Sequence, residues 1–281
     1  MSESKLLAPK PKKILIPERD IDKAPVLECI NLGITFGGLH AVEDFNIAMG
    51  PTEISGLIGP NGAGKTTIFN LLTRVYEPTH GAILLNGKDT KGLSTYQVNQ
   101  AGIARTFQNI RLFNNLTVAD NIIVSMNDKI DYGLTESIFH MGKFKKEEEK
   151  ARAKAIELLG LFDMQKYADV KAHSLPYGAQ RRLEILRALA TDPCLLLLDE
   201  PAAGMNPSET AELMENIRRI RDEFHIAVLL IEHDMSLVMN VCERIKVINF
   251  GITIASGTPQ EIASNKEVIE AYLGKSEEGE E

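Results

Sequence analysis

Short apolar runs alternate with helical patterns along the chain from Val26 onward. Three of these runs, at residues 53–59, 194–199 and 227–232, are nearly continuous and end in a polar residue or a glycine. Runs of this kind are typical of parallel strands buried on both faces, whose C-terminal ends open into a ligand crevice. The alternation therefore predicts an α/β fold with a mostly parallel core sheet, and functional residues just after these strands.

Further strand-like segments lie on either side of the first run. Residues 26–36 and 41–49 look like antiparallel strands. Residues 82–87 look like another strand that ends in Asn86 and Gly87, a pair typical of tight hairpin turns. These segments predict antiparallel strands at an edge of the core sheet.

Residues 115–190 have a different pattern, because helical periodicity dominates and no continuous apolar strand appears. Within them, residues 143–162 begin with a charged run and continue with Ile156, Leu159 and Phe162 at three-residue spacing. That spacing predicts an amphipathic helix. We expect a helical insertion over about 115–190.

The composition is that of a soluble globular protein. Of the 281 residues, 44% are hydrophobic and 25% are charged, which argues against collagenous, disordered and disulfide-rich classes. The net charge of −8 gives no protein-wide positive field, so we expect no nucleic-acid partner. Cys29, Cys194 and Cys242 lack the spacing of a zinc site, and free thiols suit a reducing cytosol.

The two ends of the chain differ from its middle. Residues 1–25 are rich in proline and lysine and are expected to be a disordered extension, with a partner-docking arm as the alternative. Residues 274–281 form an acidic tail. Because the start lacks the apolar core of a secretory signal and no run of roughly 18 apolar residues occurs, any membrane association is expected to be peripheral.

A glycine-rich segment directly follows the first apolar run and precedes a helical pattern. It matches GxxxxGK[ST], a loop whose backbone N–H groups and following helix N-terminus bind phosphates. We expect Lys65 to reach the β- and γ-phosphates of a nucleotide, Thr66 to bind Mg²⁺ and Thr67 to hold an α-phosphate oxygen. The predicted loop consists of Gly59, Pro60, Asn61, Gly62, Ala63, Gly64, Lys65, Thr66 and Thr67.

Acidic and histidine side chains follow the other two apolar runs. Asp199 and Glu200 end residues 194–200, and their adjacent carboxylates suit two separate tasks, Mg²⁺ binding and polarisation of an attacking water. His233 follows the third run at the same sheet edge and is expected near the γ-phosphate. Gln108, at the border of the helical insertion, is placed to reach Mg²⁺ or water.

Taken in order, these segments resemble the nucleotide-binding subunits of ABC transporters over residues 26–273. The most specific of them, SLPYGAQRRLEILRALA at 174–190, is similar to the family signature, which contacts the ATP of the partner subunit in a head-to-tail dimer. The resemblance implies one ABC nucleotide-binding domain. Its expected fold is a P-loop NTPase core with a mostly parallel sheet, an antiparallel β subdomain and an α-helical insertion subdomain.

The resemblance also implies a role for each matching position. Lys65, Glu200 and His233 are expected to be catalytic, and Phe36 is expected to stack on adenine. Mg²⁺ is expected to be bound by Thr66, Gln108 and Asp199. The implied signature contacts are Ser174, Leu175, Pro176, Tyr177, Gly178, Ala179 and Gln180, and the implied dimer loop is Ala203, Gly204, Met205 and Asn206.

Two positions depart from the usual family pattern. Pro176 stands where the commonest signature has a serine that helps to hold the γ-phosphate, so the backbone around Gly178 must supply the donors. Asn206 stands where many relatives have aspartate, which leaves the coupling of the two subunits at this loop open.

Within the family, LPYGAQRRLEI, LDEPAAGMNPSE, LLIEHDMSLVM and EVIEAYLG resemble the branched-chain (hydrophobic) amino acid uptake group. This implies an importer ATPase that uses ATP and Mg²⁺ on the cytoplasmic face of the inner (plasma) membrane. Its implied partners are permease subunits docked through coupling helices, a second nucleotide-binding subunit, identical or related, and, indirectly, an external binding protein. The alternatives are urea uptake, lipopolysaccharide export, a non-transport ABC ATPase acting on nucleic acid, a small-molecule kinase and a regulatory module.

Overall fold

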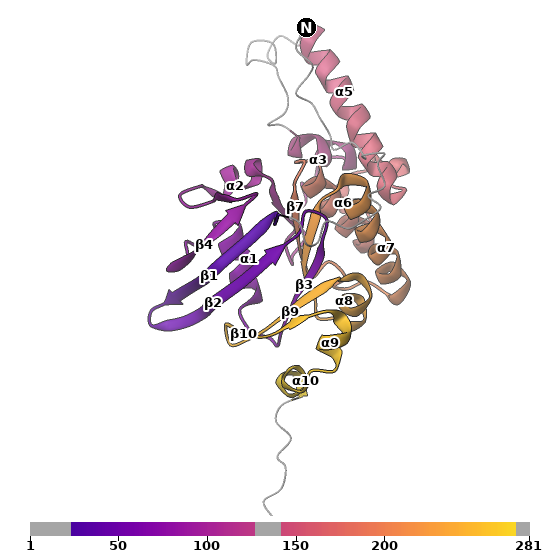
Figure 1. Ribbon diagram of the computed structural model, residues 1–281. Coiled ribbons are helices and arrows are strands. Elements are labelled where there is room, and N and C mark those ends of the chain that lie inside the picture. Colours follow the sequence, from indigo (N-terminus) through magenta and orange to yellow (C-terminus); the bar gives the residue numbers. More distant parts are fainter. Residues whose placement is uncertain (1–23, 127–141, 274–281) are drawn as a thin grey trace, which may run out of the picture.

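The computed structural model describes residues 24–126 and 142–273 and contains two β-sheets flanked by helices (Figure 1). The larger sheet has six strands in the order β10-β9-β3-β8-β7-β6, and all neighbours are parallel except β9 and β10. Its strands are β3 (Ile54–Ile58), β6 (Ile103–Arg105), β7 (Leu195–Asp199), β8 (Ala227–Ile231), β9 (Arg244–Asn249) and β10 (Ile252–Gly257). The expected α/β architecture with a mostly parallel core sheet is therefore confirmed.

The three apolar runs form β3, β7 and β8, and each of these strands is buried along its whole length. On β7, Leu196 and Leu198 pack into a cluster with α-helices, whereas Leu195 and Leu197 pack into a second cluster on the opposite face. Burial on both faces explains why these strands are continuously apolar. The hydrophobic pattern does not predict β6, β9 or β10, because β6 is very short and the other two mix buried and exposed residues.

The smaller sheet is antiparallel, with strand order β2-β1-β4-β5. The expected turn lies at Asn86 and Gly87, whose φ angles of 48° and 74° are those that a tight hairpin turn requires. The predicted antiparallel strands are thus confirmed, and they form a sheet of their own rather than an edge of the core sheet. Its strands are β1 (Leu27–Phe36), β2 (Leu39–Met49), β4 (His80–Leu85) and β5 (Lys88–Asp89).

Helices cover the larger sheet, and the smaller sheet lies beside it (Figure 1). The amphipathic helix expected over 143–162 ends at Leu159, and Gly160 to Phe162 continue as a 3₁₀ turn, so Phe162 lies outside the α-helix. The helices are α1 (Lys65–Leu72), α2 (Thr95–Ala101), α3 (Val118–Ser125), α5 (Gly142–Leu159), α6 (Tyr177–Leu189), α7 (Pro207–Phe224), α8 (Met235–Val241), α9 (Pro259–Ala263) and α10 (Lys266–Leu273). The described part of residues 115–190 holds α3, α5, α6 and three short 3₁₀ turns.

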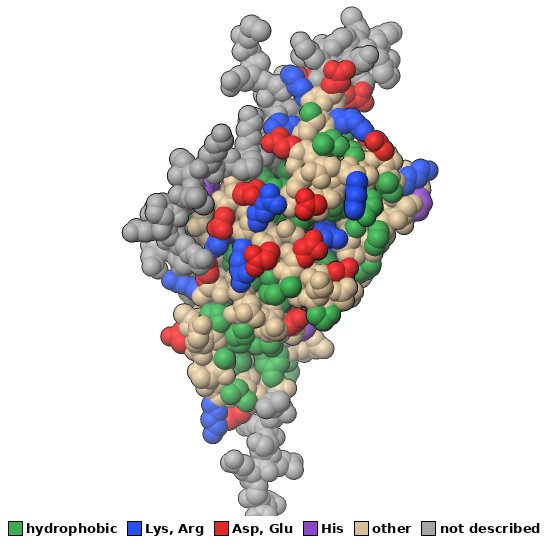
Figure 2. All heavy atoms as spheres, turned by 90° about the vertical axis from the view of Figure 1, so that its right-hand side faces the viewer, with side chains coloured by type: hydrophobic (Ala, Val, Ile, Leu, Met, Phe, Trp, Pro, Cys, Tyr) green, Lys and Arg blue, Asp and Glu red, His purple; other side chains and the backbone are tan. Residues whose placement is uncertain are grey.

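The expected N-terminal extension, apart from Ala24 and Pro25, and the acidic tail at 274–281 lie outside the described residues. On the face that includes α5, α6 and α7, positive and negative side chains are interspersed, with hydrophobic side chains gathered below them (Figure 2). Among the helices of residues 24–126 and 142–273, none is long and apolar enough to cross a membrane.

Candidate functional site

The predicted phosphate loop connects the C-terminal end of β3 to the start of α1. None of its three glycines can be replaced without strain or clash, and Gly62 has a φ of 79°. A Cβ on Gly59 would lie 2.1 Å from the carbonyl oxygen of Ile248, and Gly64, which precedes α1, has a φ of 104°. The loop therefore packs tightly against β9 and presents the positive N-terminal end of α1.

Lys65, the first residue of α1, turns its ammonium back onto this loop. Its Nζ donates to the carbonyl oxygens of Gly59, at 2.7 Å, and Pro60, at 2.9 Å. Burial lowers the pKa of Lys65, and the nearby charges of Glu200 and Asp199 oppose that shift. The site thus holds a partly desolvated cation beside the glycine-rich backbone, an arrangement suited to an anion.

The two carboxylates at the end of β7 point to different partners. Asp199 accepts a hydrogen bond from Arg105 Nη2 at 2.8 Å, and both side chains are almost fully buried. The next residue, Glu200, has a φ of 48°, so the chain turns sharply between them. The sequence-based expectation that the two acids have separate tasks is consistent with this geometry.

Glu200 lies where three of the predicted residues meet. Gln108 Nε2 donates to its Oε2 at 2.9 Å, and His233 Nε2 lies 2.9 Å from its Oε1. The three residues follow β6, β7 and β8, which are adjacent in the sheet. Parallel strand order therefore brings together side chains that are far apart in the sequence, and each carboxylate oxygen of Glu200 has a partner.

A buried glutamate that the sequence interpretation does not assign lies behind this cluster. Glu232 Oε1 accepts from the backbone N–H of Ala202 at 2.7 Å, and its Oε2 accepts from that of His233 at 3.0 Å. Burial raises the pKa of Glu232. This side chain joins the loop after Glu200 to the turn that carries His233. The only sequence indication of its role is its place as the acidic residue ending a buried apolar run.

Arg105 is a second residue missing from the predicted site. Besides Asp199, its guanidinium donates to Asn70 Oδ1 at 2.7 Å, and its Cζ lies over the rings of Phe69 and Phe107, 5.4 and 5.3 Å from their centroids. It therefore fixes the orientation of the Asp199 carboxylate from the side of α1. No motif identifies Arg105, because its partners come from separate parts of the sequence.

Phe36 ends β1, as predicted, and the residue is 42% exposed. Tyr76 makes an edge-to-face contact with it, with ring centroids 5.2 Å apart and an interplanar angle of 74°. An exposed aromatic face held by a second ring can stack on a planar ligand.

The predicted signature segment begins at Ser174, the last residue of a 3₁₀ turn (Ala172–Ser174), and ends in the first turn of α6. Pro176 is the N-cap residue of α6 and provides no side-chain cap. A Cβ on Gly178 would lie 2.8 Å from Glu209 Oε1, and one on Gly204 would lie 3.0 Å from Tyr177 Cε1. The signature segment and the predicted dimer loop are thus packed together within one chain.

Asn206, at the end of the predicted dimer loop, has a clear structural role. Its side chain caps α7 by accepting from the N–H groups of Ser208 and Glu209, both at 3.0 Å, and Glu209 Oε2 accepts from the N–H of Asn206 at 3.0 Å. An asparagine makes this capping box as well as an aspartate does.

A groove of about 560 Å³ lies between the core and the helical insertion; we call it the insertion groove. The Arg111 guanidinium stacks over Phe107 at 4.1 Å, and that of Arg187 over Phe113 at 4.9 Å. Burial lowers the pKa of Arg187. The lining of the insertion groove includes Arg105, Phe107, Arg111, Phe113, Glu184 and Arg187.

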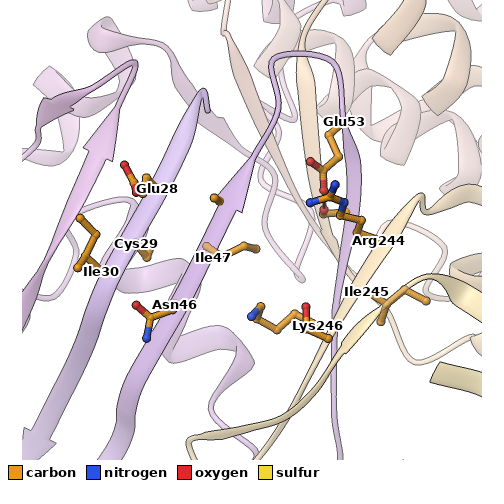
Figure 3. Close-up of a pocket in the computed structure, with 12 residues that line it drawn as sticks. Glu28, Cys29, Ile30, Asn46, Ile47, Glu53, Arg244, Ile245 and Lys246 are labelled. Atoms are coloured by element: carbon orange, nitrogen blue, oxygen red, sulfur yellow. Dashed lines mark hydrogen bonds between the residues drawn. The ribbon is translucent and has the colours of Figure 1, made fainter. Parts of the chain in front are cut away.

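A second hollow, of about 450 Å³, lies between the two sheets (Figure 3). Lys246 of β9 points into the space beside β2, and Glu53 and Arg244 lie near the start of β3 and β9. Glu53 accepts from Ser55 Oγ and from the N–H of Gly50. The predicted phosphate loop follows the other end of β3, and none of the predicted site residues lines this hollow.

Comparison with known proteins places these features in a family. A family model described as "ABC transporter" matches residues 42–203, and one described as "Branched-chain amino acid ATP-binding cassette transporter" matches residues 253–278. The high-affinity branched-chain amino acid transport ATP-binding protein LivG of Escherichia coli K12 is 45% identical over 252 residues, which cover 90% of this chain and 99% of that protein. The lipopolysaccharide export system ATP-binding protein LptB of Haemophilus influenzae is 32% identical over 250 residues, 89% of this chain and 98% of that protein.

Among solved structures, the ADP conformation of MJ1267, an ATP-binding cassette of an ABC transporter, matches with a TM-score of 0.78 and 28% identity, covering 90% of this chain and 100% of that one. With the matches in sequence, this likeness extends across the phosphate loop, the Glu200 cluster and the signature segment. The chain therefore belongs to the ABC transporter family, as one of its ATP-binding and ATP-hydrolysing cassettes.

Proposed function

We propose that this cassette powers the import of branched-chain amino acids, using ATP hydrolysis to close and reopen a head-to-tail pair of cassettes. The observation that carries the catalytic part is the convergence of Gln108 and His233 on the two carboxylate oxygens of Glu200. The likeness to branched-chain amino acid transport proteins, at the C-terminal segment as well as in the core, supports the choice of substrate.

In this proposal the triphosphate lies on Gly59 to Thr67, with the Lys65 ammonium on the β- and γ-phosphates. Glu200 is the general base that polarises the attacking water, and His233 and Gln108 hold its carboxylate in place. His233 also hydrogen-bonds the γ-phosphate. Because both oxygens of Glu200 have hydrogen-bond partners, its carboxylate is held in one orientation.

The residues present fit a magnesium ion bound together with the nucleotide. Thr66, Gln108 and Asp199 offer hydroxyl, amide and carboxylate oxygens, the ligands that Mg²⁺ takes alongside phosphates and water. Within residues 24–126 and 142–273, no group of three or more His, Cys, Asp or Glu could hold a metal by itself. When bound with ATP, Mg²⁺ neutralises phosphate charge, and Arg105 keeps the Asp199 carboxylate oriented toward that site.

The second cassette completes each ATP site. Ser174 to Gln180 contact the ATP held by the partner, and residues 203–206 contact the partner across the dimer. With no side-chain donor at Pro176, the N–H groups near Gly178 and the N-terminal end of α6 bind the γ-phosphate. The two cassettes are identical or closely related chains.

Replacing Gly178 by alanine tests the signature segment. The new Cβ would lie 2.8 Å from Glu209 Oε1, so Glu209 must move and the capping box of Asn206 is disturbed. We expect ATP turnover to fall by about tenfold or more, equal to about 1.4 kcal/mol of transition-state free energy. Binding of a fluorescent ATP analogue to the isolated cassette is expected to be unchanged, because the cassette's own phosphate loop is intact.

The matched control is Gly160→Ala, whose Cβ would make a similar approach, 2.9 Å, to Gln165 Nε2, which is likewise a side-chain end, but Gly160 lies outside the signature segment. Turnover of Gly160→Ala should equal that of the wild type. Unchanged turnover in Gly178→Ala would contradict the proposed role of the segment.

Replacing Phe36 by alanine tests the adenine site. Aromatic stacking contributes about 0.5–1.5 kcal/mol, so ATP should bind about 2- to 12-fold more weakly. Inorganic triphosphate, which has no base, should bind Phe36→Ala and the wild type equally in a competition titration. Tyr96→Ala, which removes another exposed aromatic ring, is the control for ATP binding. An equal loss of affinity for ATP and triphosphate would show that the substitution acts on the loop rather than on adenine.

The insertion groove is the proposed docking site for a short coupling helix of the permease. Its two stacked arginines and two aromatic rings, at the border of the segment that carries Gln108, offer both apolar and charged contacts. Closure of the cassettes then drives alternating access in the permease. The external binding protein and the permease select the substrate, and the cassette works at the cytoplasmic face of the inner membrane without touching the amino acid.

The proposed function is tested by purifying the cassette with its permease and binding protein in lipid vesicles. ATP hydrolysis should rise when leucine, isoleucine or valine is added with the binding protein, and not with urea. Stimulation by urea or lipopolysaccharide alone would favour one of the alternative transport roles. Salt-sensitive binding of RNA or DNA by the cassette would instead favour a non-transport ABC ATPase.

A further inference from the structure

Helix α6 carries a buried ion pair that the roles proposed above do not use. Arg181 Nη1 lies 2.9 Å from Glu184 Oε2, and the two side chains are 1% and 5% exposed. A buried ion pair is costly to desolvate and is a poor way to gain stability, since well-packed apolar residues often do as well. A gain in stability therefore does not explain why these two charges are buried together.

The pair holds the backbone of the segment that carries Gln108. Arg181 donates to the carbonyl oxygens of Phe107, at 2.6 Å, and Gln108, at 2.7 Å. Glu184 Oε1 lies within hydrogen-bond distance of the N–H groups of Phe107, at 3.3 Å, and Arg111, at 3.4 Å. Within residues 107–111, two backbone carbonyls and two backbone N–H groups are thus hydrogen-bonded to side chains of α6.

The same guanidinium also reaches the catalytic cluster. Arg181 Nη2 donates to the backbone carbonyl of Glu200 at 3.2 Å, while Gln108 donates from its side chain to the Glu200 carboxylate. Arg181, Gln108 and Glu200 therefore form a closed circuit of hydrogen bonds. Movement of residues 107–111 cannot leave Glu200 unaffected while this circuit is intact.

The position of α6 extends the circuit in two directions. Its first turn belongs to the signature segment, only a few residues before Arg181. Glu184, Phe107 and Arg111 line the insertion groove. Groove, signature segment and Glu200 are consequently attached to one rigid element through two side chains.

We propose that Arg181 and Glu184 are positioning residues that couple the insertion groove to the signature segment and to Glu200. This inference rests on the proposed function, in which the groove receives a permease helix. A helix that enters the groove displaces residues 107–111, and the ion pair carries that displacement to α6 and to the backbone at Glu200. The pair makes no contact with ATP in this scheme, so it affects the response to the permease rather than nucleotide binding by the cassette.

The test uses the full transporter in lipid vesicles, with hydrolysis measured with and without leucine-loaded binding protein. Glu184→Gln removes the charge but keeps the size of the side chain. A second variant, Arg181→Met with Glu184→Leu, replaces the pair by apolar groups and avoids leaving one charge buried alone. We expect the ratio of stimulated to basal hydrolysis to fall by about fivefold or more in both variants, the lower end of typical coupling effects. Affinity of the isolated cassette for a fluorescent ATP analogue should stay within about twofold of wild type, because a change of only about 0.4 kcal/mol indicates intact contacts.

Arg182→Met is the matched control, because Arg182 is the next residue of α6 and pairs with the exposed Glu212 at 2.5 Å. Its stimulation ratio should equal that of the wild type. As a second readout, amide hydrogen exchange within residues 107–111 should be faster in Glu184→Gln than in the wild type and unchanged in Arg182→Met.

Wild-type stimulation ratios in both variants would overturn the inference while leaving the proposed function intact. A loss of ATP affinity of about fivefold or more in the isolated Glu184→Gln cassette would also overturn the inference, because the ion pair would then support nucleotide binding itself. If the wild-type complex is not stimulated by leucine, isoleucine or valine, it is the proposed function that fails, and faster exchange confined to residues 107–111 would still test the positioning role.

Discussion

Replacing Glu200 by glutamine is expected to reduce ATP turnover by about 10²–10⁴-fold and to leave ATP binding intact. Glutamine keeps the size of the side chain but cannot accept a proton from the attacking water. It also replaces one carboxylate oxygen by an NH₂ donor, so Gln108 and His233 can no longer each bond a separate acceptor oxygen as they do on Glu200. Single-turnover hydrolysis and fluorescent-nucleotide titration separate the two effects.

The control for this substitution is Glu215→Gln on the surface of α7. The Glu215 side chain is 76% exposed and pairs with Arg218 in the same helix. Its loss should change neither turnover nor binding, since exposed ion pairs contribute about 0–1 kcal/mol. Turnover near the wild-type level in Glu200→Gln would exclude Glu200 as the general base and would direct attention to Asp199 or to water held by His233.

The parts of the fold that follow from sequence are those in which one local pattern has one physical cause. Strands β3, β7 and β8 are continuously apolar because both of their faces are buried, so their pattern predicts strand, burial and central position together. Strand β6 has no such pattern. It is three residues long, and its place in the sheet depends on pairing with β7, which is remote in the sequence.

The same distinction between local patterns and remote partners applies to the candidate site. Glycine spacing predicts the phosphate loop, and its position at the end of an apolar run predicts where the acids and the histidine must gather. Arg105 cannot be found in this way, because its carboxylate partner Asp199 is 94 residues away in the sequence. Arg181, Glu184 and Glu232 bond mainly to backbone atoms of other segments, and backbone partners leave no mark in residue types.

The unassigned residues share a location behind the predicted ones. Glu232 fixes the distance between the Glu200 loop and the His233 turn, and Arg181 fixes the backbone of Gln108 and Glu200. In the proposed function the predicted residues face the nucleotide, whereas these hold the loops that carry them. Catalytic geometry in this cassette is therefore set by buried charges whose cost is offset by hydrogen bonds to loop backbone.

Replacing Lys65 by alanine is expected to weaken ATP binding by about 10- to 150-fold, because a hydrogen bond between charged groups contributes about 1.5–3 kcal/mol. The ammonium is nearly buried, and its only hydrogen-bond acceptors within the described parts of the chain are the carbonyl oxygens of Gly59 and Pro60. Burial removes water from the ammonium, and the phosphate oxygens of bound ATP provide negative charge and hydrogen-bond acceptors in its place. A titration with fluorescent ATP measures the loss, and Lys88→Ala, on exposed β5, is the control.

The pH dependence of binding gives a sharper test of the same lysine. Burial lowers the pKa of Lys65 in the free cassette, so its ammonium loses its proton at lower pH than an exposed lysine does. Bound phosphate favours the charged form and raises that pKa again. ATP affinity should consequently decrease as the pH rises through the lowered pKa of the free form, whereas Lys65→Ala should lack that decrease and Lys88→Ala should retain it. An affinity for ATP that is unchanged in Lys65→Ala, or a pH dependence that persists in it, would contradict the role of this lysine in the phosphate loop.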